Sequence, residues 1–333
     1  MSPAHRALTL ASPSKINLFL EVLRRRPDGY HTLSTLFQEI SLSDTLRVRA
    51  RATSATTLVT NEGSLPTDET NLVLRAARVF QDAFPTTPGF SFSLTKRIPI
   101  GAGLGGGSGN AAAALKACWS LATGRSPVRA PWEALLPLAR RLGADVPFFL
   151  RGGLASAGGV GDRLTFLSPR RGRTFHFVLV FPRIFSSTPE AYRALRFPLT
   201  KRRSGLKLTR AIQDGASPRL WAPWLFNRLE EAVLPRLVPV AQVKEALLRA
   251  GCLNALMTGS GSSVFGVVEN SRHGRQVAAR LRGEPWDVRL VSSVLRRLSS
   301  TTMVDEVGSH GNHRNSRHSP HGGQAQGLRH GHL

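Results

Sequence analysis

Hydrophobic and polar positions alternate in the manner of β-strands over much of the first fifty residues. The alternation covers 14–23, 35–40 and 45–50, and its period of two is that of a strand with one buried face. A turn signal, Pro-Asp-Gly at 27–29, separates the first two runs. Because such a short connection joins antiparallel neighbours, the pattern predicts an antiparallel sheet at the start of the chain.

A helical period then replaces the alternation. Apolar residues recur three and four positions apart within 70–83, which predicts a helix. A strand is expected at 90–95, and further helices at 110–122 and 132–142. The helix at 110–122 is rich in alanine, which favours a helix and leaves a small face suited to burial.

The second half predicts a different succession of elements, in which strands and helices are mixed. The region 198–223 is basic, polar and rich in Pro and Gly, and is interpreted as a loop with one short helix. A β, turn, β, α, β series closes this half and is typical of a small α+β domain. The expected elements are strands at 154–157, 175–181, 255–258, 264–268 and 286–291, and helices at 240–250 and 275–281.

The composition changes abruptly near residue 305, where apolar residues become rare and histidines accumulate. We therefore predict three parts: an N-terminal domain at 1–165, a C-terminal domain at 166–300, and a disordered, His-rich tail at 301–333. Clustered imidazoles can bind metal, but no ligand spacing repeats in this tail, so no metal site is predicted there.

The overall composition is that of a globular protein with a sizeable core, since 41% of 333 residues are apolar. There are two cysteines, Cys118 and Cys252, and both lie among Ala and Leu. This favours two buried thiols over a disulfide framework and is expected for a cytoplasmic protein. We see no signal peptide, and no apolar run approaches the roughly 18 residues that span a bilayer.

A formal net charge of +24 raises the alternative of a nucleic-acid-binding protein. Only six of the 45 basic residues are lysines, and the arginines are scattered along the chain without one long basic run or interleaved aromatic residues. Since a positive field would also attract a polyphosphate substrate, the charge does not decide between the two functions.

The segment 101–110 reads Gly-Ala-Gly-Leu-Gly-Gly-Gly-Ser-Gly-Asn and directly precedes a predicted helix. Successive glycines let backbone N–H groups turn inward around an anion, and the helix N-terminus adds further donors. The segment lacks the acidic partner of a dinucleotide fold and the Gly-Lys-Ser/Thr of a Walker A loop. Protein-kinase motifs are also absent. The residues expected to bind nucleotide are Pro99, Ile100, Gly101, Ala102, Gly103, Leu104, Gly105, Gly106, Gly107, Ser108 and Gly109.

Together with the glycine segment, three other segments resemble the GHMP kinases, a superfamily of small-molecule kinases. They are 11–18 (Ala-Ser-Pro-Ser-Lys-Ile-Asn-Leu), 142–147 (Leu-Gly-Ala-Asp-Val-Pro) and 257–263 (Met-Thr-Gly-Ser-Gly-Ser-Ser). The resemblance implies an α+β, two-domain fold, with an N-terminal domain like ribosomal protein S5 domain 2 and a ferredoxin-like C-terminal domain. It also implies an active site between them that uses ATP and Mg²⁺.

Segments 25–31 (Arg-Arg-Pro-Asp-Gly-Tyr-His), 36–38 (Leu-Phe-Gln) and 187–192 (Ser-Thr-Pro-Glu-Ala-Tyr) are similar to a narrower group of these kinases. That group phosphorylates the 2-hydroxyl of 4-(cytidine 5′-diphospho)-2-C-methyl-D-erythritol in non-mevalonate isoprenoid synthesis. The resemblance implies that this small molecule is the substrate and that the protein has no nucleic-acid or membrane partner. It also implies that the protein is a monomer or a homodimer. A kinase of the homoserine or mevalonate type is the alternative.

Two residues are expected to be catalytic. Asp145 follows a helix end in apolar surroundings, where an acid is costly unless paired; its own context leaves a structural and a catalytic carboxylate equally open. Lys15 lies in a strand-like apolar run, which is unusual for an ammonium group. The resemblance implies that Asp145 accepts the proton of the substrate hydroxyl, and that Lys15 keeps it ionised and stabilises charge at the attacking oxygen.

The resemblance also implies the residues that bind the acceptor. Tyr30, His31 and Tyr192 match positions that grip the cytidine, while Asn17 and Thr188 match polar contacts to the methylerythritol diphosphate. Ser108 is the candidate contact to Mg²⁺ or a β-phosphate, and the metal would be held mainly by ATP oxygens and water.

The sequence departs from its relatives at two places. Gly109 replaces a serine usual in the phosphate loop, which removes a candidate hydroxyl. Arg228 replaces the aspartate of an Asn-Asp-Leu-Glu segment, which puts a local structural contact in doubt.

Overall fold

The computed structural model describes residues 7–168, 172–196 and 203–296. These belong to one compact unit within Met1–Leu298. The predicted tail at 301–333 lies outside the described residues, and the predicted domain boundary near residue 165 stays a prediction.

The first sheet is built on two long antiparallel strands, as the alternation predicted. β1 (Ala7–Arg25) pairs with β2 (His31–Ala50) along nearly its whole length, with three breaks in register. The strand order is β3-β4-β2-β1-β8, and β5 and β6 extend the sheet from β2. The remaining strands are β3 (Thr57–Thr60), β4 (Phe90–Thr95), β5 (Leu154–Gly158), β6 (Arg163–Leu167) and β8 (Phe226–Asn227).

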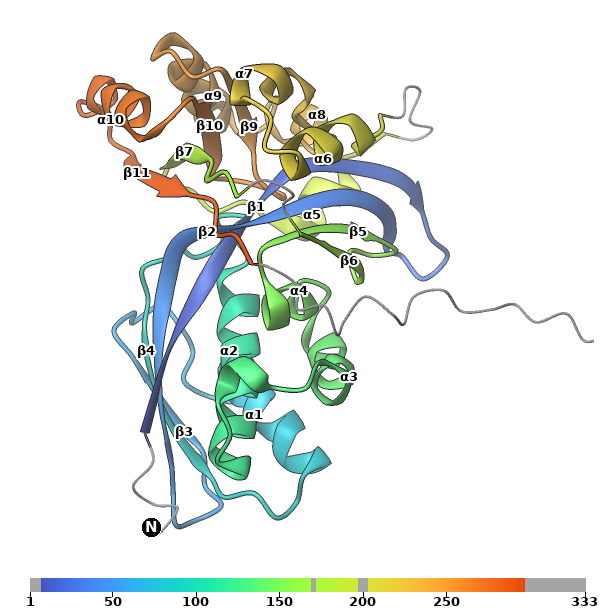
Figure 1. The fold of residues 1–333 in the computed structure, drawn as a ribbon, viewed down its shortest axis with the longest axis vertical. Coiled ribbons are helices and arrows are strands. Elements are labelled where there is room, and N and C mark those ends of the chain that lie inside the picture. The colour runs from blue at the N-terminus through green and yellow to red at the C-terminus, as the bar shows by residue number, and fades with distance from the viewer. Residues whose placement is uncertain (1–6, 169–171, 197–202, 297–333) are drawn as a thin grey trace, which may run out of the picture. The chain divides into compact units, whose positions relative to one another are not determined.

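Four helices cover one face of this sheet (Figure 1). The Asn71 side chain accepts a hydrogen bond from the Val73 N–H and so begins the first of them. The second has alanines that are almost completely buried, so it approaches the sheet and its neighbours closely. The helices are α1 (Leu72–Ala83), α2 (Gly106–Thr123), α3 (Trp132–Leu142) and α4 (Val146–Arg151).

The second sheet is antiparallel and has the strand order β11-β7-β10-β9. Two helices, α9 (Val238–Arg249) and α10 (Ser271–Arg280), pack against its strands. This β-α-β-β-α-β arrangement is the ferredoxin-like fold that the resemblance implied. The strands are β7 (His176–Phe181), β9 (Asn254–Met257), β10 (Val264–Val268) and β11 (Asp287–Ser292).

The region 198–223, predicted as a loop with one short helix, differs most from the prediction, and its residues 198–202 lie outside the described residues. From residue 206 onward it is largely helical, with α6 (Leu206–Gln213), α7 (Pro218–Trp221) and a 3₁₀ turn at Ala222–Trp224. Leu208, Ile212 and Trp221 are buried against the core. Tertiary burial of these few apolar residues outweighs the local preference of a basic, breaker-rich segment. The short helices α5 (Thr188–Arg193) and α8 (Glu230–Val233) were not predicted either.

Arg228, the unusual residue of the Asn-Arg-Leu-Glu segment, links the second half of the chain to β1. Its guanidinium donates to both carboxylate oxygens of the fully buried Glu21, at 2.7 and 2.9 Å, and pairs with Glu231 at 2.6 Å. The hydrogen bonds that Arg228 donates to Glu21 raise the pKa of Arg228 above its usual range. Arg228, which replaces the aspartate of the relatives, therefore forms a bidentate ion pair with Glu21.

No helix in the described parts of the chain is long and apolar enough to cross a membrane.

Candidate active site

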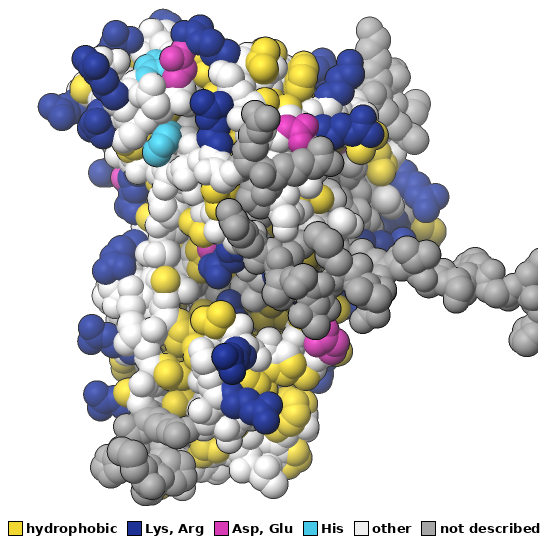
Figure 2. Space-filling model, viewed as in Figure 1, with side chains coloured by type: hydrophobic (Ala, Val, Ile, Leu, Met, Phe, Trp, Pro, Cys, Tyr) yellow, Lys and Arg dark blue, Asp and Glu magenta, His cyan; other side chains and the backbone are white. Residues whose placement is uncertain are grey.

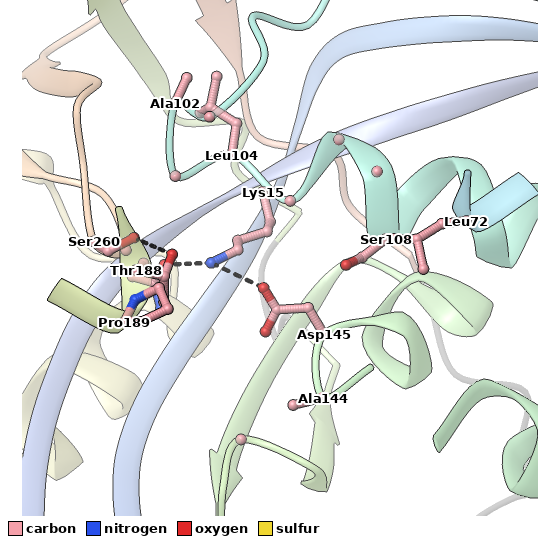
Figure 3. Close-up of a pocket in the computed structure, with 18 of the residues that line it drawn as sticks. Lys15, Leu72, Ala102, Leu104, Ser108, Ala144, Asp145, Thr188, Pro189 and Ser260 are labelled. Atoms are coloured by element: carbon pink, nitrogen blue, oxygen red, sulfur yellow. Dashed lines mark hydrogen bonds and ion pairs between the residues drawn. The ribbon is translucent and has the colours of Figure 1, made fainter. Parts of the chain in front are cut away.

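A cavity of about 950 Å³ is lined by residues from both halves of the chain. β1 and β2 form one wall, the glycine segment and α2 form another, and α5 with the turn after β9 closes a third side. Asp145 is the sole carboxylate among the described residues that line it. Figure 3 shows Lys15, Asp145, Ser108, Thr188 and Ser260 converging on this space.

The glycine segment enters α2 through three left-handed residues. Gly101, Gly103 and Gly105 have φ between 66° and 74°, which L side chains rarely adopt. A Cβ on Gly103 would lie 2.2 Å from the carbonyl oxygen of Thr258, so the close approach of another backbone also requires glycine there. α2 begins at Gly106, earlier than predicted, and its first N–H groups lie at the cavity. The arrangement is suited to bind an anion.

Lys15 and Asp145 form an ion pair at the wall of the cavity. The Lys15 ammonium lies 3.5 Å from the Asp145 carboxylate and donates a 2.7 Å hydrogen bond to Oδ1 of Asn17. It also lies 5.0 Å from the ring centre of Phe37. The side chain of Lys15 is 6% exposed and that of Asp145 is 34% exposed, so the carboxylate is the more accessible partner.

The backbone fixes both members of this pair. The Lys15 N–H donates to the Leu104 carbonyl at 3.0 Å, which ties β1 to the glycine segment. Asp145 is the residue that precedes α4, in the tight turn closed by the bond from Val146 N–H to the Gly143 carbonyl. Both groups therefore sit on elements anchored in the core.

An aromatic cluster occupies another part of the cavity wall. The rings of His31 and Tyr192 stack with centroids 5.0 Å apart and planes 24° from parallel, while Tyr30 is 66% exposed. Burial, and secondarily the negative charge of Asp145, raises the pKa of Tyr192. Burial, and secondarily Arg25, lowers the pKa of His31, which favours its neutral imidazole. A neutral, flat surface of this kind can stack on a base.

A turn rich in serine, residues 259–263, connects the two sides of the cavity. Thr188 and Ser260 share a 2.7 Å hydrogen bond between their hydroxyls, and Ser186 donates to the Ser260 carbonyl at 2.6 Å. On the other side, the Ser263 N–H donates to the Ala102 carbonyl at 3.2 Å. The turn thereby joins the start of α5 to the glycine segment.

A fully buried carboxylate, Asp44, supports both ends of the glycine segment. It accepts hydrogen bonds from the backbone N–H groups of Arg97 and Ile98 at 2.7 and 2.9 Å, and from the Asn110 side chain at 2.9 Å. It also pairs with Lys96, whose side chain reaches the cavity. Asp44 thus fixes the chain entering the glycine loop and the helix leaving it.

Of the residues predicted from the sequence, all but one line the cavity. The exception is Gly109, which lies in α2 against β1, where an added Cβ would be 2.6 Å from the Pro13 carbonyl oxygen. A side chain at this position is directed at β1. The missing hydroxyl at position 109 therefore removes no group from the cavity wall.

Several residues that line the cavity were not predicted. Arg25, Phe37 and Pro189 lie within the segments 25–31, 36–38 and 187–192 that carry the resemblance, but no role was assigned to them. Thr35 alternates with Phe37 on one face of β2, which was the available signal for it. The others lie in ordinary strands, helix starts and loops without a local pattern that marks them, and include Leu65, Pro66, Thr70, Asn71, Leu72, Leu94 and Arg193.

The residues that line the cavity are better suited to a metal ion that arrives bound to nucleotide phosphates than to one held by protein ligands alone. Within the parts of the chain that the structure describes, no three His, Cys, Asp or Glu side chains come together as a metal site. Ser108 and Asp145 are the oxygen donors at the start of α2 and α4, and Mg²⁺ is commonly held by one or two such groups with phosphates and water.

The fold and the cavity define a GHMP kinase. The GHMP kinases N terminal domain matches residues 71–153, and the GHMP kinases C terminal domain matches residues 216–287. Among solved structures, homoserine kinase from Cytophaga hutchinsonii has the same fold, with a TM-score of 0.67 at 19% identity over 87% of this chain and 95% of that one.

Relatives of greater similarity share one name. 4-Diphosphocytidyl-2-C-methyl-D-erythritol kinase from Pelotomaculum thermopropionicum is 42% identical over 279 residues, 83% of this chain and 94% of the relative. That from Chlorobium luteolum is 38% identical over 83% and 94% of the two chains. A crystal structure of 4-(cytidine 5′-diphospho)-2C-methyl-D-erythritol kinase has a TM-score of 0.72 at 35% identity, covering 86% of this chain and 99% of that one. The chain belongs to this family of GHMP kinases.

Proposed function

We propose that this protein transfers the γ-phosphoryl group of ATP to the 2-hydroxyl of 4-(cytidine 5′-diphospho)-2-C-methyl-D-erythritol. The observation that carries the proposal is the position of the Lys15–Asp145 pair, in one cavity with a glycine-rich anion loop and an aromatic cluster. The identity of the acceptor is inferred from the names of the relatives. The protein would act in the cytoplasm as a monomer or homodimer, in two domains divided near residue 165.

The nucleotide phosphates would bind the glycine segment. N–H groups at the start of α2 and in the turn before it can donate to phosphate oxygens without a side chain in the way. Gly103 and Gly105 allow this approach because of their left-handed backbone. When bound with ATP, Mg²⁺ would neutralise phosphate charge, with Ser108 as the protein's hydroxyl contact.

Asp145 would accept the proton as the acceptor oxygen bonds to the γ-phosphorus and the bond to the ADP oxygen breaks. The Lys15 ammonium would hold Asp145 in place through their ion pair and offset negative charge on the attacking oxygen. Since phosphoryl transfer passes through a loose transition state, alignment of the two oxygens with the phosphorus matters more than the basicity of Asp145.

The aromatic cluster would hold the cytidine of the acceptor. Tyr30 and Tyr192 offer faces for stacking, and His31 can also hydrogen-bond to the edge of the base. Asn17 and Thr188 would contact the methylerythritol diphosphate. A kinase for homoserine or mevalonate has no need of such a surface, so the cluster favours the cytidine acceptor over these alternatives.

Release of ADP by the purified protein with Mg-ATP would test the proposal. Turnover should appear with 4-(cytidine 5′-diphospho)-2-C-methyl-D-erythritol and not with homoserine, mevalonate or no acceptor. Turnover with one of the other acceptors alone would keep the kinase and overturn the proposed role of the aromatic cluster. Inactivity with every acceptor would overturn the proposed function.

A further inference from the structure

Thr35, a buried threonine of β2, makes two hydrogen bonds whose directions are fixed by chemistry. Its Oγ1 lies 2.6 Å from the carbonyl oxygen of Phe19, which can only accept, so the Thr35 hydroxyl donates its proton there. The same Oγ1 lies 2.8 Å from the Asn17 side-chain amide. With its proton committed to Phe19, Oγ1 can only accept from Asn17. Thr35 therefore requires the NH₂ end of the Asn17 amide to face it.

This requirement sets the other end of the same amide. With its NH₂ group towards Thr35, Asn17 presents Oδ1 to the Lys15 ammonium, which lies 2.7 Å away and can only donate. A reversed amide would place NH₂ against an ammonium group and leave Thr35 without a donor. Asn17 is 1% exposed and Thr35 3% exposed, so water does not readily replace either bond.

A β-bulge brings these groups together. Asn17 pairs with Phe37 and Phe19 with Leu36, so Leu18 has no partner in the register. The extra residue brings the Phe19 carbonyl and the Asn17 side chain within reach of one hydroxyl on the neighbouring strand. Bulges are frequent next to active sites, because they re-aim side chains in this way.

We propose that Thr35 is a positioning residue for phosphoryl transfer, which fixes the Asn17 amide and through it the ammonium of Lys15. The inference rests on the proposed function, in which Lys15 acts on the reacting oxygens. One Lys15 proton is taken by Asn17 and another faces Asp145 at 3.5 Å, which leaves the third for the cavity. If the Asn17 amide rotates by half a turn, Lys15 loses the 2.7 Å hydrogen bond that orients its ammonium towards the transferred group.

The test compares Thr35→Val, which keeps the shape and removes the hydroxyl, with Thr35→Ser, which keeps the hydroxyl. Thr35→Val should lower kcat about tenfold or more, the scale of one lost hydrogen bond to a charged group. The KM for ATP should stay within about twofold, and Thr35→Ser should retain near wild-type kcat. Equal kcat for Thr35→Val and wild type, or an equal loss in both variants, would overturn the inference.

A double-mutant comparison separates this role from a general structural one. In an Asn17→Ala background, Thr35→Val should lower kcat by less than about twofold, because the amide that Thr35 orients is gone. Independent losses that multiply in the double variant would overturn the inference. If Thr35→Val does not fold, as judged by circular dichroism, Thr35→Ala and Thr35→Ser serve as the same pair.

The acceptor used in these assays is the one that wild type phosphorylates. If the wild-type protein phosphorylates another acceptor instead, the proposed substrate is wrong, but the Thr35 variants can still be compared with that acceptor. Normal turnover of the cytidine substrate by Thr35→Val would contradict the inference alone.

Discussion

The two sheets differ in what they bury. On β1 and β2, buried positions include Lys15, Asn17, Thr35 and Asp44, and each has hydrogen-bond or charge partners. β7, β9 and β10 bury almost only apolar side chains. A buried polar group stabilises a fold only when its partners are in place. The first sheet therefore has polar side chains of the site at buried positions where apolar side chains would otherwise pack. The second sheet is a stable support that reaches the cavity through the 259–263 turn.

The face of the molecule drawn in Figure 2 shows no such division. On this face, Lys and Arg side chains are dispersed over both halves, with few acidic groups among them. The basic charge seen there is therefore not confined to one region, whereas the buried side chains distinguish the two.

The comparison predicts its largest effect on activity in the first region. Asp145→Asn and Lys15→Met should each lower kcat by about 10²-fold or more, the scale of a lost proton acceptor or charge-stabilising group. Steady-state ADP release measures this, and thermal unfolding should show a midpoint close to that of wild type. A kcat near wild type in either variant would contradict the assigned roles.

The matching change in the second region should affect stability instead. Leu247 of α9 is fully buried against the second sheet and does not line the cavity. Leu247→Ala should lower the free energy of unfolding by about 2–5 kcal/mol through lost burial and the cavity left behind. Urea unfolding measures the loss. At a temperature where the variant is folded, kcat should be within about twofold of wild type, and a tenfold drop would show that the two regions are not separable.

A partly buried lysine on α2 should give the first region a pH dependence of its own. Burial lowers the pKa of Lys116 on α2 from its usual 10.5 to about 8, and its ammonium donates to the carbonyls of Phe149 at 3.0 Å and Leu150 at 3.4 Å. Between pH 8 and 10.5 the unfolded chain binds this proton and the folded chain does not. Stability should therefore rise with pH there, by at most about 3 kcal/mol.

Lys116→Met provides the control for that rise. Urea unfolding at pH 7.5, 9 and 10 should show a smaller gain with pH in Lys116→Met than in wild type, whatever the absolute stability of the variant. Parallel curves for the two proteins would show that Lys116 does not titrate in this range.

The smallest effects should fall on acceptor affinity. Tyr30→Ala and Tyr192→Ala should each raise the KM for the cytidine acceptor by about 5- to 100-fold, the scale of one base–aromatic stack of about 1–3 kcal/mol. The KM for ATP should be unchanged. Tyr192→Phe keeps the ring and is the matched control, so a loss equal to that of Tyr192→Ala would show that stacking is not the role of this residue.

Much of the fold could be predicted because its patterns are local. The strand at 90–95 and the helix at 132–142 have the predicted bounds, and the pair of long strands at the start is antiparallel as expected. The prediction for 206–224 allowed one short helix where the structure has two and a 3₁₀ turn. Burial of Leu208, Ile212 and Trp221 decides this structure, and burial depends on partners distant in the sequence.

The candidate site divides in the same way. The sequence by itself determined the glycine segment, Lys15, Asp145 and the aromatic residues, because each lies in a compact motif that resembles the GHMP kinases. Only the tertiary structure decided that Gly109 faces β1, that Asp44 supports the glycine loop, and that Thr35 meets Asn17. These are contacts between separate segments, and hydrogen bonds act over about 3 Å, so they are set by strand register and packing.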